Sequence, residues 1–351
     1  MYSNNYSTRL SGAITWLRFP LIFFIILLHC YSVATIPGQH NLYFGVLYPF
    51  SLWLGETGVP GFFFISGFLL FLSRKSYTEK LKTRLHTLLV PYLLWNLLLL
   101  MLYLVAYAAG HPQDIYGQNM ADFTLTDYLR LFWDRGHFDD GNFVPLLCPL
   151  WYIRNLFIMV VLSPLLYPII KKAGLPFLLV VTVWWLLTYH NAFIQQTLLF
   201  FSLGAYFSVQ GVNPLKVAYE HKTLLLTLFA IFAISDIVSH TMLPTPVNLQ
   251  LHRLSLIFNI PALLLLADVC VRRGLSSQSL PGAAFIVFCI HYPIVVPLRK
   301  LIISHFDGAS DIVHILLYAA SVVIVTLLSL AFCKLLDRWL PGVKKLLSGN
   351  R

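Results

Sequence analysis

The chain is dominated by apolar runs long enough to cross a lipid bilayer as helices. One crossing takes about 20 predominantly apolar residues. Lipid offers no partner to backbone N–H and C=O groups, so such runs have to be helical. The sequence therefore predicts an all-α, polytopic transmembrane helix bundle of about ten spans. These lie near residues 16–36, 46–72, 87–109, 150–170, 175–190, 194–210, 222–240, 253–271, 282–303 and 312–336.

Composition excludes the soluble classes of protein. Of the 351 residues, 58% are hydrophobic and 11% are charged, whereas soluble domains average about 45 to 50% and about 25%. The fifth and sixth runs are short, and one hairpin interrupted near Asn191 is an alternative to two spans. There is no repeat or separate soluble segment, so we expect one membrane domain over residues 1–351. The first run has no A-x-A-like cleavage site and is interpreted as a retained helix.

The basic residues predict the orientation. A net charge of +10 would suggest a nucleic-acid partner in a soluble protein, but in a membrane protein it marks the cytoplasmic side. With both termini cytoplasmic, eighteen of the 24 Lys and Arg residues face inward. We therefore expect no nucleic-acid partner. An outer loop near 110–149 carries several aspartates and a short helix capped by Thr124 or Thr126. The five cysteines show neither a disulfide framework nor metal-ligand spacing, so no metal is expected.

A few ionisable residues lie inside the predicted spans, where they are costly and therefore candidates for function. They are Arg18, His29, Glu56, Asp268 and His291. Arg18 and His29 are eleven residues apart, which places them on one helix face with an axial separation of ~16 Å. For Arg18 an orientation anchor is the structural alternative, and for His29 an interhelical hydrogen bond.

Two other spans contain residues that are unusual in a membrane helix. The second has Gly58, Pro60, Gly61, Ser66 and Gly67, which favour close approach of a helix or a ligand, with helix packing as the alternative. A basic loop at 74–84 follows it. In the ninth span, Pro293 cannot donate to the carbonyl of Cys289, which predicts a broken helix beside His291.

Taken together, these segments resemble the integral membrane acyltransferase-3 family. The matching pieces are WLRFPLIFFIILLHCY, GVPGFFFISGFLL, KLKTRLHTLLVPY, PLWYIRNLFIMVVLSPLLY and FIVFCIHYPI, in this order between about residues 14 and 336. Members of this family move acyl groups, mostly acetyl, from cytoplasmic acyl-coenzyme A to extracytoplasmic sugars. The chain departs from the family pattern at Phe19 and Pro20, which could alter the start of the first helix, and no esterase-like domain follows the tenth span.

The resemblance implies a donor site and a catalytic base. Acyl-coenzyme A has an anionic head and an arm of about 15 to 20 Å, close to the ~16 Å between Arg18 and His29. The phosphates would bind basic groups at the inner face, and the thioester would reach His29 as general base, with a transient acyl-histidine as a variant. The residues implied for the donor are Arg18, Arg74, Lys75, Arg84 and Ser66.

The remaining candidates concern the acceptor. His291, Ser66 or a backbone N–H would stabilise the oxyanion, and His291 also counts as a substrate-binding residue. Trp151, Tyr152 and Arg154 would stack on and hydrogen-bond a sugar, with an interfacial aromatic belt as an equal alternative.

The sequence thus predicts a multi-pass O-acyltransferase of the bacterial inner membrane. It would transfer an acyl group, acetyl in the first instance, from acetyl-CoA to a cell-surface or lipid-linked glycan. A transporter or flippase that performs no chemistry is the rival, since it too would use broken helices and buried ionisable groups. A noncatalytic partner of a glycan polymerase has no positive support.

Overall fold

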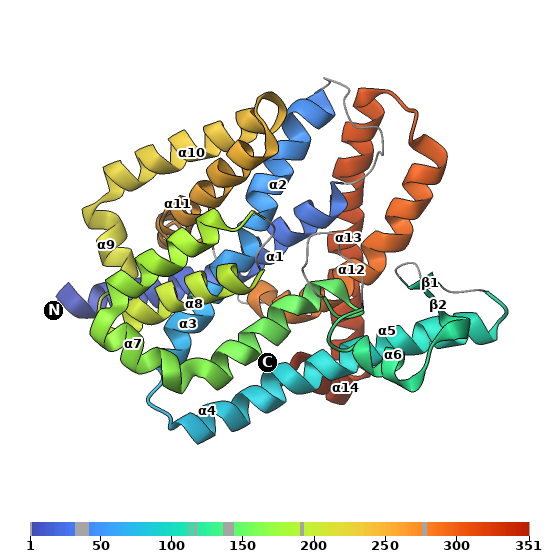
Figure 1. Cartoon of the computed structure of the whole chain (residues 1–351), viewed down its shortest axis with the longest axis horizontal. Coiled ribbons are helices and arrows are strands. Elements are labelled where there is room, and N and C mark those ends of the chain that lie inside the picture. Colours follow the sequence, from blue (N-terminus) through green and yellow to red (C-terminus); the bar gives the residue numbers. More distant parts are fainter. Residues whose placement is uncertain are drawn as a thin grey trace.

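α-Helices form almost the whole of the computed structural model (Figure 1). The structure describes residues 2–31, 42–111, 114–115, 118–135, 144–189, 193–275 and 279–350. The α-helices are α1 (Tyr2–Cys30), α2 (Tyr48–Glu56), α3 (Gly58–Leu72), α4 (Tyr77–Arg84), α5 (Val90–Ala108), α6 (Leu125–Arg130), α7 (Trp151–Leu187), α8 (Phe193–Val209), α9 (Pro214–Glu220), α10 (Lys222–Met242), α11 (Thr245–Arg272), α12 (Ser279–Phe306), α13 (Asp311–Trp339) and α14 (Pro341–Ser348). Short π-helical and 3₁₀ turns join some of them: η1 (Tyr43–Leu47), η2 (Leu85–Leu89), η3 (Met120–Asp122) and η4 (Cys148–Leu150).

The helical segments confirm a polytopic bundle. Within the described residues, eight segments are long and apolar enough to cross a membrane, and α8 is a shorter apolar helix. The eight are Ser7–Cys30, Tyr43–Leu72, Tyr77–Ala108, Cys148–Leu187, Lys222–Met242, Thr245–Arg272, Gly282–Phe306 and Asp311–Trp339.

Helix α7 accounts for two of the predicted spans. Its 37 residues would extend about 55 Å at 1.5 Å per residue, well beyond a bilayer core of about 30 Å. The helix bends at Ala173, whose φ of −137° and ψ of 39° are not helical. Pro176 cannot donate to the carbonyl four residues earlier, which weakens the ladder at this point. The predicted spans 150–170 and 175–190 are therefore the two arms of one bent helix, whereas the predicted break near Asn191 lies outside the described residues.

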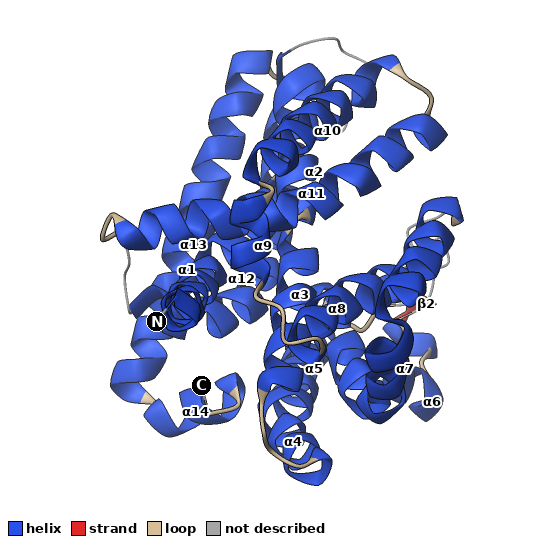
Figure 2. Cartoon of the chain, turned by 90° about the vertical axis from the view of Figure 1, so that its left-hand side faces the viewer, coloured by secondary structure: helices blue, strands red, loops and turns tan. Residues whose placement is uncertain are grey.

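Helix α1 is central, because it packs against α2, α3, α11, α12 and α13 (Figures 1 and 2). Small residues permit the close contact with α2 and α3. A Cβ atom on Gly55 would lie 2.5 Å from the side chain of Leu28, and one on Gly58 would lie 2.7 Å from that of Ile25. Packing, the structural alternative for the glycines of this run, thus explains Gly58.

Helices α3 and α8 are in backbone contact. A Cβ atom on Gly67 would collide with the carbonyl of Phe201, and one on Gly204 would collide with the carbonyl of Phe64. Each glycine thus faces the backbone of the opposite helix where α3 and α8 cross, and neither position has room for a larger residue. The sequence marked only Gly67 of this pair.

Three prolines within the predicted spans affect their helices differently. The second predicted span is interrupted at Thr57, between α2 and α3, since Pro60 has no N–H for the carbonyl of Glu56. By contrast, α12 runs without interruption through Pro293. The broken helix predicted there is wrong, because neighbouring groups in a membrane helix can compensate for one lost donor. Pro20 likewise lies inside an uninterrupted α1.

The connecting segments contain more structure than predicted. Most of the expected basic loop is helix α4, which begins at Ser76 with a capping box to Glu79. In the loop after α5, Thr124 caps α6, as predicted, and its hydroxyl and backbone N–H donate to Asp127 and lower the pKa of that carboxyl. A two-stranded antiparallel hairpin, β1 (Asp114–Ile115) with β2 (Gln118–Asn119), precedes it.

Candidate active site

Three predicted donor residues lie around one cavity. We name it the Arg18 cavity; it has a volume of about 560 Å³ and is enclosed by α1, α3, α4, α7 and α12. Its lining includes Arg18, Ser66, Arg84, Tyr152 and Phe288. The Ser66 hydroxyl lies 3.4 Å from the Tyr152 hydroxyl. The predicted donor residues Arg18, Ser66 and Arg84, which span 66 positions of the sequence, thus line one cavity, as the donor-site hypothesis requires.

Neither arginine of this cavity is neutralised. Arg18 and Arg84 make no hydrogen bond or ion pair with any described residue. Two guanidinium groups on an otherwise largely apolar cavity attract an anion, and the planar fork of Arg matches phosphate oxygens in particular. Arg74 and Lys75, by contrast, lie exposed in the linker between α3 and α4 and do not line the cavity.

A second hollow adjoins the Arg18 cavity at the N-terminal end of α1. This N-terminal groove has a volume of about 290 Å³ and shares Arg18 and Leu69 with the Arg18 cavity. Hydroxyl and amide side chains contribute to its lining, including Ser7, Ser11 and Asn213. Arg18 therefore lies between two neighbouring spaces, one lined partly by hydroxyl and amide groups and one reaching into the bundle.

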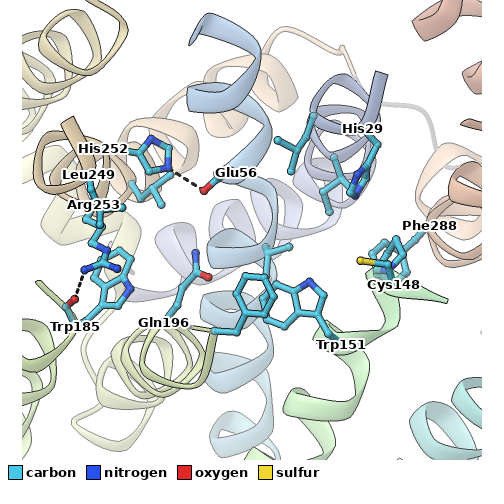
Figure 3. A pocket seen from close by; sticks show the side chains of 16 residues that line it. His29, Glu56, Cys148, Trp151, Trp185, Gln196, Leu249, His252, Arg253 and Phe288 are labelled. Carbon is cyan, nitrogen blue, oxygen red and sulfur yellow. Dashed lines mark hydrogen bonds and ion pairs between the residues drawn. The ribbon is translucent and has the colours of Figure 1, made fainter. Parts of the chain in front are cut away.

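The third hollow, which we name the His29 cavity, lies at the other end of α1. It has a volume of about 180 Å³, and its lining includes His29, Glu56, Cys148, Trp151, Gln196, His252 and Phe288 (Figure 3). Phe288 also lines the Arg18 cavity, and its ring meets the edge of Tyr152 at 5.8 Å. Phe288 thus lies between the two cavities, and Tyr152 packs against it on the side of the Arg18 cavity. The three hollows thus follow one another along the uninterrupted α1, from the N-terminal groove past Arg18 to His29.

His29 lies against a second histidine. The ring centroids of His29 and His291 are 5.3 Å apart, and Tyr292 contacts His29 edge-on at 5.1 Å. His291 is fully buried, and its Nδ1 donates to the carbonyl of Phe288 at 2.6 Å. Its Nε2 has no hydrogen-bond partner in the described part of the chain. His291 is packed beside His29 and does not line the His29 cavity.

The three residues predicted to bind a sugar are separated. Trp151 lines the His29 cavity and stacks on Phe193 at 3.9 Å, whereas Tyr152 lines the Arg18 cavity. Arg154 lines neither cavity, because its buried guanidinium donates to the carbonyl of Trp133 at 2.6 Å and to the side-chain oxygen of Asn155. Its contact is with the loop that follows α6, which it attaches to α7.

Asp268, another ionisable residue of a predicted span, belongs to a cluster of protein contacts. Arg9 binds it in a bidentate manner, at 2.9 and 2.6 Å, and Arg272 donates to it at 3.0 Å. Tyr219 donates at 2.6 Å, and both burial and this carboxylate raise the pKa of Tyr219. The cluster joins α1, α9 and α11 and explains Asp268 without a ligand.

One group of residues in the His29 cavity was missed by sequence reasoning. His252 lies between two carboxylates, with Nε2 2.9 Å from Glu56 and Nδ1 2.8 Å from Asp236. Asp236 falls inside a predicted span, and Asp236 and His252 are each eight residues from Pro244, where an antiparallel hairpin turns. Their equal distance from the turn is the sequence signal that could have identified Asp236 and His252 as neighbours. Arg253, also on the cavity wall, donates to the carbonyls of Trp185, Leu186 and Thr188.

Comparisons with known proteins give the chain a family. Residues 11–334 match the acyltransferase-3 family, described as an acyltransferase domain. The chain is 28% identical over 358 positions to the succinoglycan biosynthesis protein ExoH of Rhizobium meliloti (strain 1021), covering 97% of this chain and 92% of that protein. No solved structure matches it. The match extends over nearly the whole bundle, so the chain belongs to the acyltransferase-3 family.

Proposed function

We propose that this protein is a membrane O-acyltransferase that moves an acyl group from cytoplasmic acyl-coenzyme A to a hydroxyl of an extracytoplasmic or lipid-linked sugar. Acetyl is the donor group we expect first, and the bacterial inner membrane is the expected location. The observation that carries the proposal is the row of three hollows along α1, with two unneutralised arginines near one end and His29 at the other.

The anionic end of the donor binds at Arg18 and Arg84. The phosphates are strongly charged and remain at the predicted inner face, where the N-terminal groove supplies hydroxyl groups beside Arg18. The thin pantetheine arm is uncharged and extends through the Arg18 cavity toward Phe288. The length of the arm, about 15 to 20 Å, is similar to the ~16 Å rise from Arg18 to His29.

The chemistry takes place at His29. The imidazole accepts the proton of the acceptor hydroxyl while the oxygen attacks the thioester carbonyl carbon. The carbon–sulfur bond then breaks, and the coenzyme A thiolate takes the proton back from His29. His291, packed against His29, limits the positions that the His29 ring can adopt.

The acceptor is a sugar of a polysaccharide. The relative ExoH is named for succinoglycan biosynthesis, and a polysaccharide supplies the hydroxyl that the reaction needs. Trp151, stacked on Phe193 at the wall of the His29 cavity, offers the flat apolar surface on which sugar rings pack.

The test compares wild-type protein with the His29→Ala variant. Surface glycans from cells with wild-type protein should be heavier by one acyl group per modified sugar than those from cells with His29→Ala, by mass spectrometry. Coenzyme A should protect both purified proteins against heat to the same extent. Unchanged glycan masses combined with no protection by coenzyme A would favour a transporter or flippase and refute the proposal.

A further inference from the structure

The wall of the His29 cavity opposite His29 carries a carboxylate whose position is fixed by the protein. Glu56 lies at the end of α2, and its side chain is 38% exposed (Figure 3). One oxygen, Oε2, is bound to His252 Nε2. The other, Oε1, makes no hydrogen bond to any described residue. Glu56 therefore presents a free acceptor oxygen to the cavity.

Three helices hold this carboxylate in place. His252 of α11 binds Glu56 through one nitrogen and Asp236 of α10 through the other. Because carboxylates accept hydrogen bonds and do not donate them, both nitrogens carry protons and the ring is an imidazolium. Ser255 donates to the same oxygen of Asp236 at 3.1 Å, and the Asp236 side chain is only 5% exposed. In this hydrogen-bonded series, Asp236 is buried and held by Ser255, whereas Glu56 at the other end is accessible from the cavity.

Other groups of the cavity suit a ligand rich in hydroxyls. Gln196 lines it, and its side-chain amide makes no hydrogen bond within the described residues. Trp151 supplies an aromatic surface beside these polar groups. The cavity has a volume of about 180 Å³, which suits a small polar group such as one sugar residue.

We propose that Glu56, oriented by His252 and Asp236, binds the hydroxyl groups of the acceptor sugar and aims one of them at His29. This assignment rests on the proposed function and adds the acceptor side to it. Glu56 accepts a hydrogen bond from a sugar hydroxyl through Oε1, and Trp151 packs against the ring. His252 and Asp236 are positioning residues. The anionic head of the donor, bound at Arg18 on the far side of Phe288, does not contact Glu56.

The test separates acceptor binding from donor binding. Purified protein is assayed with acetyl-CoA as donor and, as acceptors, oligosaccharides released from the surface polysaccharide of a strain that lacks this protein. Glu56→Gln should raise the KM for the oligosaccharides about 10-fold to 100-fold, as expected for a lost hydrogen bond to a charged group. The KM for acetyl-CoA should stay within about twofold of wild type by the same reasoning, since the donor site is separate. Glu220→Gln, which changes an exposed carboxylate of α9, is the matched control and should alter neither value.

Positioning residues give a second, independent measurement. Asp236→Asn should also raise the acceptor KM, by less than Glu56→Gln, and leave the acetyl-CoA KM unchanged. Should Glu56→Gln not fold, Glu56→Asp and His252→Gln replace it with the same expectation. Equal acceptor KM values in wild type and folded variants would overturn the inference while leaving the proposed function intact. An equal rise in both KM values would overturn it as well, because a general loss of structure affects both sites. Wild-type protein that releases no coenzyme A and acylates no oligosaccharide would refute the proposed function itself.

Discussion

Replacing Arg18 by alanine should weaken coenzyme A binding without harming the fold. Arg18 has no hydrogen bond or ion pair among the described residues, so its removal leaves no protein group unpaired. It also lines the same cavity as Arg84, and the two like charges repel each other when no anion is present. The protein without ligand should therefore be as stable as wild type or slightly more stable. An orientation anchor would give the opposite result, a loss of stability or of expression.

The size of the effect follows from the lost contact. A hydrogen bond to a charged group contributes about 1.5 to 3 kcal/mol, which corresponds to a Kd about 10-fold to 100-fold higher. At a coenzyme A concentration of about 100 times the wild-type Kd, the ligand stabilises wild type by about 2.7 kcal/mol. A tenfold weaker variant would be stabilised by only about 1.4 kcal/mol at the same concentration.

The assay is thermal unfolding of purified protein in detergent across a coenzyme A titration. Arg84→Ala should behave like Arg18→Ala. The double variant should lose less than the sum of the two single losses if both guanidinium groups contact one phosphate. Arg130→Ala, at an exposed residue of α6 that pairs with Asp134, is the control and should bind normally. Full stabilisation of Arg18→Ala by coenzyme A would refute the donor site.

Three further predictions concern packing, the buried cluster and sidedness. Gly204→Ala should lower the free energy of unfolding by about 1 to 3 kcal/mol or abolish folding, since the added Cβ would collide with the backbone of α3. A melting temperature equal to that of wild type would contradict the close contact of α3 and α8. Asp268→Asn should lower the melting temperature, because it removes the buried carboxylate to which Arg9, Arg272 and Tyr219 donate, but should not alter the Kd of coenzyme A. A changed Kd with unchanged stability would assign Asp268 to the donor site. A membrane-impermeant maleimide added to intact cells should label Cys148, which lines the His29 cavity, and should not label Cys270, near the predicted inner end of α11. Cys148→Ser is the control for the labelled site. Labelling of Cys270 but not of Cys148 would show that the predicted orientation is inverted.

Sequence reasoning succeeded where the relevant geometry is local. Arg18 and His29 lie on one helix, and helical geometry alone relates residues eleven positions apart. The cap at Thr124 was predictable for the same reason, since its partner Asp127 is three residues away. Length and hydropathy likewise sufficed for a polytopic bundle, because lipid permits few alternatives to helices.

It failed where the partner comes from a distant segment. The two carboxylates that bind His252 come from α2 and α10, whereas His252 itself lies on α11. The contact of Gly204 with α3 likewise joins segments more than 130 residues apart in the sequence. The contact of Arg154 with the carbonyl of Trp133 joins residues that are 21 positions apart, so no sequence pattern indicated it and Arg154 was assigned to a sugar instead. Trp151 and Tyr152 were grouped as neighbours, yet consecutive helix residues point about 100° apart and here face different cavities.

The position of Phe288 between the Arg18 and His29 cavities, with Tyr152 packed against it, has a consequence for the cell's energy supply. A protein with deep hollows on both sides of a bilayer risks becoming a leak for ions, and each charge that crosses dissipates about 2.3 kcal/mol per 100 mV. Phe288 borders both the Arg18 cavity and the His29 cavity, and Tyr152 packs against its ring. We expect this pair to hinder water and ions from passing between the two cavities, and in the proposed reaction the pantetheine arm would occupy that passage. An acyltransferase built in this way would send a chemical group across the membrane while the membrane stays electrically sealed.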